Sequence, residues 1–341
     1  MNRDILDQEA YTQHPGTVVD RGAFSHVMAL ALNPLDNTEG VIRCITEREG
    51  NVDLKGYIDK SMLYKIESVQ GLEKYTITQP LEIKGKDIII KKLLRADEDF
   101  IGLEDPDIIV DETTNTLHLF FTIPLLNKSG TEHRIHLGHA QGKDLNSLEM
   151  TDPVLSPSHK IPVGAKELSL APINSEGMRL NLIESSDEID GVGYSTLRIG
   201  KSKQFGPPWE FGDTVMHPKF DGKKWCAEHM SPGPLLPEDF ISVGSGKRLG
   251  ILNGREASVI KDGKTQYGMF SVGLFIYDYE KGKVDWISQK PLIIDSEAST
   301  ITFASEFIQL DNDSGLLYAH VDDSFVRAYT LHAPSIKELL P

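Results

Sequence analysis

Short runs of β-branched, aromatic and aliphatic residues recur along the whole chain, and this pattern constrains the fold more than any other feature of the sequence. Polar clusters rich in Asn, Asp and Gly separate the runs and favour tight turns, because these residues tolerate positive φ angles or bond to their own backbone. Almost no stretch repeats its apolar residues with the 3.6-residue period of a helix. The sequence therefore predicts an all-β fold built from antiparallel strands. The clearest runs are residues 107–110, 117–122, 134–139, 179–183, 249–252, 273–277 and 316–321.

Hairpin turns are predicted at polar clusters between these runs, and helices only near the two ends of the chain. Helical patterns are confined to residues 4–11 and 335–339. The predicted turns are residues 111–115, 174–177, 261–264, 280–283 and 311–315.

An all-β chain of this length must protect the edges of its sheets, and large sandwiches, barrels and propellers are the common solutions. A propeller blade takes about 40–50 residues in compact repeats. The 341 residues allow about 68 residues for each of five four-stranded blades with long loops. No linker rich in Pro, Gly or Ser divides the chain. We therefore expect residues 1–341 to form one domain, a five-bladed β-propeller with a short helical N-terminal segment at about residues 1–15.

The charge balance excludes several classes of partner. The chain has 35 Lys and Arg residues against 51 Asp and Glu, and its formal net charge is −16. A protein that binds nucleic acid needs a clustered cationic face, and an anionic membrane surface would repel this chain. The longest apolar runs, such as residues 27–32, fall far short of the ~20 residues that span a bilayer. Because residues 1–9 carry charges where a secretory signal needs its apolar segment, we expect a cytoplasmic protein.

Familiar catalytic and metal motifs are missing from the sequence. Two cysteines, Cys44 and Cys226, exclude a disulfide framework and a C-x-x-C site, and both are expected to be buried. There is no G-x-S-x-G elbow, no H-E-x-x-H zinc motif and no complete phosphate-binding or dinucleotide fingerprint. We therefore expect neither a metal ion nor a cofactor.

An acidic cluster at the start of one predicted strand is the feature that points to chemistry. Glu104, Asp105 and Asp107 place three carboxylates within four residues. Packing such charges together raises at least one pKa, which a fold tolerates mainly where proton transfer is wanted. The alternative is a solvated loop that ends in an Asp-Pro turn.

Residues 102–106, G-L-E-D-P, resemble the G-x-E-D-P-R motif of glycoside hydrolase family 130, a family of five-bladed β-propellers that includes β-mannoside phosphorylases and β-mannosidases. Weaker similarities follow in the order of that family and together span roughly residues 20–330. They lie at residues 134–145, 166–172, 225–234, 303–306 and 317–323. The resemblance implies a propeller fold and an enzyme that acts on an oligosaccharide.

Three departures from the family pattern concern its phosphate site. Phosphorylase members hold inorganic phosphate with arginines and a lysine. Here Asp107 replaces the arginine of the motif, Glu184 or Ser185 replaces a second arginine, and His229 replaces the lysine. Because carboxylates repel phosphate, the pattern favours a hydrolase in which a carboxylate activates water.

The resemblance also suggests roles for individual residues. Inverting hydrolysis needs a protonated and an ionised carboxyl group about 6.5–9.5 Å apart. Asp105 is the candidate general acid, Glu228 the first candidate for the base and Glu306 the second. The candidate sugar-binding residues are Arg43, Glu104, Asp107, Lys166, His229, Arg255, Tyr318 and Asp323. Of the tryptophans Trp209, Trp225 and Trp286, at least two are expected in the core rather than stacked on sugars.

Two other functions fit the same residues. One is an inorganic-phosphate-dependent β-mannoside phosphorylase that has rebuilt its anion site with His229, Arg255 and other cations. The other is a non-catalytic carbohydrate-binding propeller, since an altered motif can also mark a decayed active site.

Overall fold

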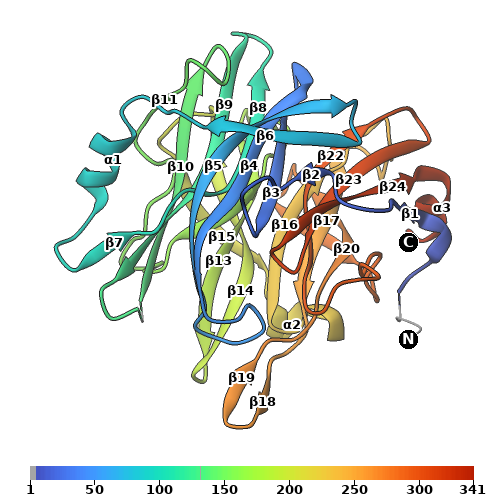
Figure 1. The fold of residues 1–341 in the computed structure, drawn as a ribbon. Helices are drawn as coiled ribbons and strands as arrows, with labels where there is room; N and C mark the ends of the chain where they lie inside the picture. The colour runs from blue at the N-terminus through green and yellow to red at the C-terminus, as the bar shows by residue number, and fades with distance from the viewer. Residues whose placement is uncertain (1–4, 131) are drawn as a thin grey trace.

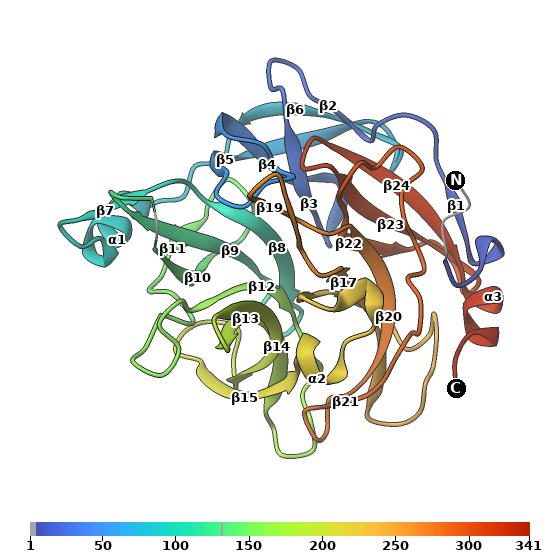
Figure 2. The same cartoon turned by 90° about the horizontal axis from the view of Figure 1, so that it is seen from below.

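The computed structural model describes residues 5–130 and 132–341. Strands dominate this part of the chain, which confirms the all-β prediction. Seen from one end, the sheets lie around a common centre (Figure 2). No helix in the described part is long and apolar enough to cross a membrane.

The N-terminal part of the chain forms two five-stranded sheets. One has the order β2-β6-β5-β4-β3, and the other has the order β11-β10-β9-β7 with β8 also paired to β9. Their strands are β2 Val19–Asp20, β3 Val27–Asn33, β4 Asp36–Glu49, β5 Ile58–Gln70, β6 Lys74–Pro80, β7 Glu98–Phe100, β8 Glu104–Asp111, β9 Thr116–Asn127, β10 His133–Gly142 and β11 Glu149–Met150.

The middle of the chain forms an eight-stranded sheet in the order β12-β13-β14-β16-β17-β20-β21, with β15 also paired to β14. Strands β14 and β16 meet at one parallel pair, Ser195 with His229. The strands are β12 Ala165–Ser169, β13 Arg179–Ile189, β14 Val192–Ser202, β15 Glu210–Met216, β16 His229–Leu235, β17 Lys247–Arg255, β20 Phe270–Asp278 and β21 Lys283–Ile287.

The two ends of the chain share the last large sheet. Its order is β1-β24-β23-β22, so the N-terminal strand pairs with the C-terminal one. The hairpin β18–β19 forms a separate two-stranded sheet and projects at the lower end of Figure 1. These strands are β1 Tyr11–Gln13, β18 Val259–Lys261, β19 Lys264–Gln266, β22 Thr302–Gln309, β23 Ser314–Val321 and β24 Phe325–His332.

The predicted hairpins are confirmed, because each of the five polar clusters joins two antiparallel strands. The strand pairs are β8 with β9, β12 with β13, β18 with β19, β20 with β21, and β22 with β23. Asn, Asp and Gly in these turns supply the conformations that the reversals need, as Asn115, Asp262 and Gly282 show with their positive φ angles.

Helices are short and few in the described part of the chain. The C-terminal helix, α3 Ala333–Glu338, agrees with the predicted position. The expected N-terminal helical segment is largely wrong: residues 1–4 lie outside the described residues, and a 3-10 turn at Gln8–Ala10 gives way to β1 at Tyr11. Pairing of β1 with β24 holds these residues extended. The remaining helical elements are α1 Lys86–Leu93, α2 Pro218–Asp221 and a 3-10 turn at Lys224–Cys226.

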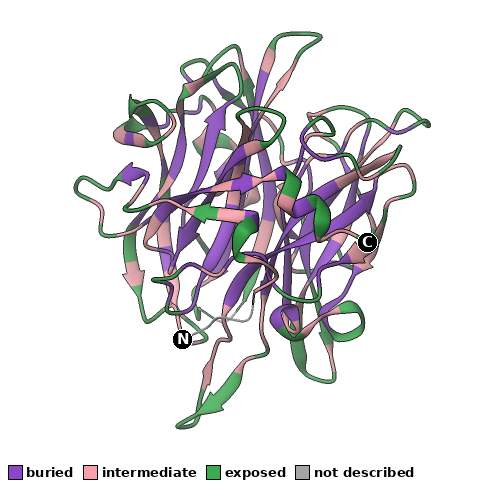
Figure 3. Cartoon of the chain, turned by 90° about the vertical axis from the view of Figure 1, so that its right-hand side faces the viewer, coloured by how far each residue is buried: buried purple, intermediate pink, exposed green. Residues whose placement is uncertain are grey.

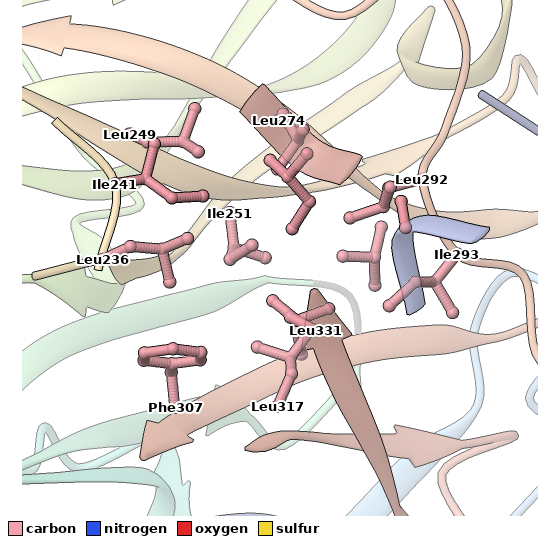
Figure 4. Close-up of a cluster of buried hydrophobic side chains, with 14 of the residues drawn as sticks. Leu236, Ile241, Leu249, Ile251, Leu274, Leu292, Ile293, Phe307, Leu317 and Leu331 are labelled. Carbon is pink, nitrogen blue, oxygen red and sulfur yellow. The ribbon is translucent and has the colours of Figure 1, made fainter. Parts of the chain in front are cut away.

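Buried residues lie mainly on the strands and exposed residues mainly in the loops (Figure 3), and most of the buried residues are apolar. One cluster includes Leu249, Ile251, Leu274 and Leu317, each fully buried, and brings β17, β20 and β23 together (Figure 4). Each such side chain contributes about 1.5–3 kcal/mol through burial. This packing holds the sheets in fixed positions around the centre of the molecule.

The strands nearest the centre contact one another in a closed series. Strand β3 contacts β8 and β22, β12 contacts β8 and β16, and β16 contacts β22. These strands therefore surround the centre of the molecule, and side chains at their bulges are placed to meet there.

Candidate active site

Every strand of the central series has an irregular pairing with its neighbour. Such bulges bend a strand and re-aim its side chains. Asp105 and Glu167 both adopt left-handed φ angles of 48° at these points, and Ala29 adopts 50°. This conformation costs roughly 1–3 kcal/mol for a residue other than glycine and is concentrated at functional sites. The shifts fall between Met28 and Leu30, Glu104 and Asp107, Lys166 and Leu168, Pro232 and Leu235, and Ala304 and Glu306.

The bulges open onto a cavity of about 440 Å³, which we call the axial cavity. Its walls come from every large sheet and carry charged, histidine and aromatic side chains, a mixture that suits a polyhydroxylated ligand. The charged and histidine residues are Arg43, Asp105, His133, Lys166, Glu167, Glu184, His229, Arg255, His320 and Asp323, and the aromatic residues are Tyr57, Tyr267, Phe270 and Phe303.

A second cavity of about 190 Å³, the rear cavity, shares Asp105, Glu167 and Phe303 with the axial cavity. These three residues therefore stand between the two cavities. Asp107 and Glu306 line the rear cavity and not the axial one. Burial raises the pKa of Asp107 to about 7 and that of Glu306 to about 8.

Asp105 is positioned by a close approach between two backbones. Gly102 has a φ of 132°, and a Cβ at this position would lie 2.0 Å from the carbonyl oxygen of Ser61. The glycine therefore lets the chain run against β5 immediately before the acidic cluster. Arg43 of β4 then donates to Asp105 at 2.9 Å and to Glu104 at 2.5 Å.

The two acids held by Arg43 differ in position. Asp105 lines the axial cavity. Glu104 does not line it, but forms an ion pair with Arg43, which does. Burial, opposed by Arg43 and reinforced by Asp105, raises the pKa of Glu104 to about 7.

Glu184 of β13 lies between two partners that the sequence separates widely. Its Oε1 is 3.5 Å from Lys166 Nζ, and its Oε2 is 3.0 Å from His229 Nε2. Burial disfavours the charged carboxylate, but His229 and Lys166 outweigh it and lower the pKa of Glu184 to about 2. Burial also lowers the pKa of His229. At neutral pH this side of the cavity therefore holds an ionised carboxylate between Lys166 and His229.

Arg255 is held by Glu228 and by an aromatic ring. Glu228 Oε1 lies 3.3 Å from Arg255 Nη2, and Glu228 Oε2 accepts a hydrogen bond from the backbone N–H of Ser258. The guanidinium of Arg255 lies 4.1 Å from the ring centroid of Tyr267. Both oxygens of Glu228 are thus engaged, and Glu228 does not itself line the axial cavity.

Asp323 is a further carboxylate on the wall of the axial cavity. His320 Nε2 lies 3.1 Å from one of its oxygens, and the hydroxyl of Tyr57 donates to the other at 3.3 Å. Burial opposes ionisation of Asp323, but His320, Arg43 and Arg48 hold its pKa below the ordinary value. Asp323 is therefore a carboxylate acceptor on the cavity wall.

The structure brings most of the predicted residues to the centre, with clear exceptions. Asp105, Arg43, Lys166, His229, Arg255 and Asp323 line the axial cavity. Glu104 and Glu228 stand behind arginines, and Asp107 and Glu306 face the rear cavity.

Tyr318, an expected sugar-binding residue, lines neither the axial nor the rear cavity. It is fully buried in the cluster around β3 and β24, and its hydroxyl donates to the carbonyl of Leu72 at 2.8 Å. The tryptophans also lie outside the site: Trp209 and Trp225 are buried in core clusters, and Trp286 packs against another core cluster.

Several cavity residues were not among the predicted ones, and Glu167 is the most important of them. The signal was present, because Glu167 directly follows Lys166 in a segment singled out by its resemblance. The aromatic wall residues Tyr57, Tyr267 and Phe270 come from segments with no motif, and only the fold brings them together. No group of three or more His, Cys, Asp or Glu residues suited to a metal ion occurs in residues 5–130 and 132–341.

Comparison with known proteins gives matches in structure only. No family model matches the chain, and no curated protein matches its sequence. A β-1,2-mannobiose phosphorylase from Listeria innocua, solved with β-1,2-mannobiose, aligns with a TM-score of 0.61 and 14% identity over 99% of this chain and 95% of its own.

Two further solved structures show the same likeness. A mannose phosphorylase from Leishmania mexicana, solved with a phosphate ion, aligns with a TM-score of 0.55 and 13% identity over 95% of this chain and 89% of its own. A thermostable family-43 glycoside hydrolase aligns with a TM-score of 0.54 and 11% identity over 93% of this chain and 91% of its own. The resemblance to the mannoside phosphorylases is thus confirmed for the fold.

Proposed function

We propose that this protein is a glycoside hydrolase that acts on β-mannosides or related oligosaccharides by an inverting, two-carboxylate mechanism. The proposal includes a five-bladed propeller, in which the eight-stranded sheet is two blades joined at the pair Ser195–His229. The irregular pairings in β3, β8, β12, β16 and β22 support one inner strand for each blade.

The observation that carries the proposal is the pairing of the cations on the axial cavity wall. Among the described residues, its Lys and Arg side chains are Arg43, Lys166 and Arg255. Arg43 is paired with Glu104 and Asp105, Lys166 with Glu184, and Arg255 with Glu228. An incoming phosphate dianion would have to displace a carboxylate from one of these pairs. Water requires no such displacement, which favours hydrolysis.

Asp105 is proposed as the general acid because it stands on the axial cavity wall at a strained bulge. Its carboxyl group delivers a proton to the leaving oxygen, directly or through a sugar hydroxyl, as the glycosidic C–O bond breaks. Arg43, at 2.9 Å, fixes the orientation of the carboxyl group. It also stabilises the negative charge that remains after proton transfer.

Glu184 is the favoured base among the carboxylates that the structure brings to the axial cavity. It is ionised at neutral pH and is oriented by Lys166 and His229. Of the earlier candidates, Glu228 does not line the axial cavity, and Glu306 faces the rear cavity with a pKa of about 8. A protonated carboxyl group is a poor base at neutral pH. Glu184 would take a proton from water as the water oxygen bonds to the anomeric carbon.

Aromatic and polar side chains supply recognition of the sugar. Tyr57, Tyr267 and Phe270 offer ring faces or edges to the cavity, and Asp323 offers carboxylate oxygens to hydroxyl groups. This combination suits an oligosaccharide whose rings have one apolar face and several hydroxyl groups.

A phosphorylase is the second candidate, and the fold of the two phosphorylase structures favours it. In that reaction, phosphate would enter beside Lys166 and Arg255 and displace Glu184 and Glu228 from them. A carbohydrate-binding protein without activity is the third candidate.

One experiment separates the three candidates. A panel of β-mannobioses is incubated with the protein in the presence and absence of inorganic phosphate, and products are separated by chromatography. The hydrolase releases mannose at the same rate in both conditions. Mannose 1-phosphate formed only with phosphate would identify a phosphorylase. If no product forms while mannobiose raises the melting temperature, the protein is a binding module.

A further inference from the structure

Two carboxyl groups, not one, stand at the partition between the axial and rear cavities. Asp105 on β8 and Glu167 on β12 occupy bulges on neighbouring inner strands, and each has a left-handed φ of 48°. Both line both cavities, and a hydrogen bond joins their side chains. Two carboxyl groups can share a hydrogen bond only if one of them is protonated.

The surroundings place that proton on Glu167. Asp105 accepts a hydrogen bond from the guanidinium of Arg43 at 2.9 Å, which fits an ionised carboxylate. Burial and the charge of Asp105 raise the pKa of Glu167 well above its ordinary value, although Lys166 opposes this. The pair thus resembles a dyad in which two close carboxyl groups hold one proton.

The other charged groups around Glu167 come from several elements. They are Arg43 on β4, Glu104 and Asp107 on β8, Lys166 on β12, Glu184 on β13, His229 on β16 and Glu306 on β22. Lys166 and Arg43 are the cations nearest the pair, so a second negative charge formed there during reaction is compensated locally.

We propose that Glu167 is the proton-holding partner of Asp105, and that the proton delivered to the leaving oxygen rests on Glu167 before reaction. This inference rests on the proposed function and assigns a further residue to its mechanism. During reaction the proton passes from Glu167 to Asp105 along their shared hydrogen bond, and from Asp105 to the glycosidic oxygen as the bond from that oxygen to the anomeric carbon breaks. The water oxygen bonds to that carbon, and the proton of the water goes to Glu184. Both members of the pair are then ionised and Glu184 is protonated; when product leaves, Glu184 releases its proton to solvent water and the pair takes one up from it.

The first test is the pH dependence of kcat in Glu167→Gln, Glu167→Asp and the unchanged protein. In Glu167→Gln, Asp105 must hold the proton alone. The pH at which kcat falls on the alkaline side is therefore expected to decrease by at least about one unit, which corresponds to an about tenfold smaller protonated fraction at a given alkaline pH. Glu167→Asp keeps a carboxyl group, so its alkaline limb stays above that of Glu167→Gln even if its rate is lower. If kcat falls equally in both variants and the alkaline limb of the pH profile stays where it is in the unchanged protein, the role of Glu167 is purely structural and the proposal is overturned.

The second test needs no activity and therefore separates this inference from the proposed function. The infrared carbonyl-stretch band of protonated carboxyl groups is measured at pH 7. Glu167→Gln is expected to remove one component of that band, and Asp105→Asn to shift the frequency of the same component. Glu306→Gln is the matched control, since it removes a different component that Asp105→Asn leaves in place. A band unchanged in Glu167→Gln, with circular dichroism as in the unchanged protein, overturns the proposal even if sugar hydrolysis is observed.

Discussion

The substitution Glu184→Gln removes the one negative charge that Lys166 and His229 share. It keeps the size of the buried Glu184 side chain and leaves the half-buried Lys166 without its ion-pair partner. The pKa of Glu184 falls from its ordinary value of 4.5 to about 2 in the folded protein, and this difference corresponds to about 3 kcal/mol of stability. Breaking a buried ion pair by removing one partner costs a similar amount, about 3–5 kcal/mol. We expect the free energy of unfolding to fall by about 3 kcal/mol at pH 7.

The pH dependence of this loss follows from the sign of the shift. Because the pKa of Glu184 is lower in the folded protein, its contribution is complete above pH 4.5 and disappears as the pH falls toward 2. The loss in Glu184→Gln is therefore expected to be the same at pH 7 and at pH 5.

Urea denaturation followed by tryptophan fluorescence measures both values. The matched control is Glu188→Gln, an exposed position on the same strand, whose effect is expected within about 0.5 kcal/mol of zero. Phosphate is expected to stabilise Glu184→Gln and not the unchanged protein, because only the variant leaves Lys166 free. A loss below about 1 kcal/mol at both pH values would refute the account of the Glu184 pairing.

Three other substitutions test separate parts of the site. Asp105→Asn is expected to lower kcat on a mannobiose about 10²–10⁴-fold with an unchanged circular dichroism spectrum, and near-normal turnover would remove Asp105 from the acid role. Between pH 5 and 7, the free energy of unfolding is expected to fall less steeply with pH in Glu306→Gln than in the unchanged protein, by about 1.4 kcal/mol per pH unit. The pKa of Glu306 is raised to about 8, so its contribution to stability is complete below pH 4.5 and is lost as the pH rises through 8; identical slopes in urea titrations would contradict this. Tyr318→Phe is expected to lower the free energy of unfolding by about 1–3 kcal/mol, because the hydrogen bonds of its hydroxyl to the carbonyl of Leu72 and to Tyr75 are lost, and to leave KM unchanged; a raised KM would place Tyr318 in the site.

The sequence predicted the strands and hairpins well because their signals are local. A buried strand is encoded by its own β-branched residues, and a turn such as residues 111–115 by its own Asp and Asn. Asp105 could be singled out for the same reason, since its motif lies within five consecutive residues, and it lines the axial cavity.

The pairings and placements that sequence reasoning missed depend on contacts across the fold or on an irregular strand. Lys166, Glu184 and His229 come from three strands, so their pairing has no local signature. Asp107 lies two residues after Asp105, which in a regular strand would place it on the same face. The irregular pairing between Glu104 and Asp107 breaks that rule, and Asp107 lines only the rear cavity. Tyr318 faces the core because partners on other strands cover it.

The anomeric form of the first product distinguishes inverting hydrolysis from phosphorolysis. A β-mannobiose is mixed with the protein in phosphate buffer, and proton and phosphorus NMR spectra are recorded before the released sugar mutarotates. We expect α-mannose as the first product and no sugar phosphate, because the carboxylates of the axial cavity keep its cations from phosphate and present water to the anomeric carbon. Mannose 1-phosphate as the first product would contradict it.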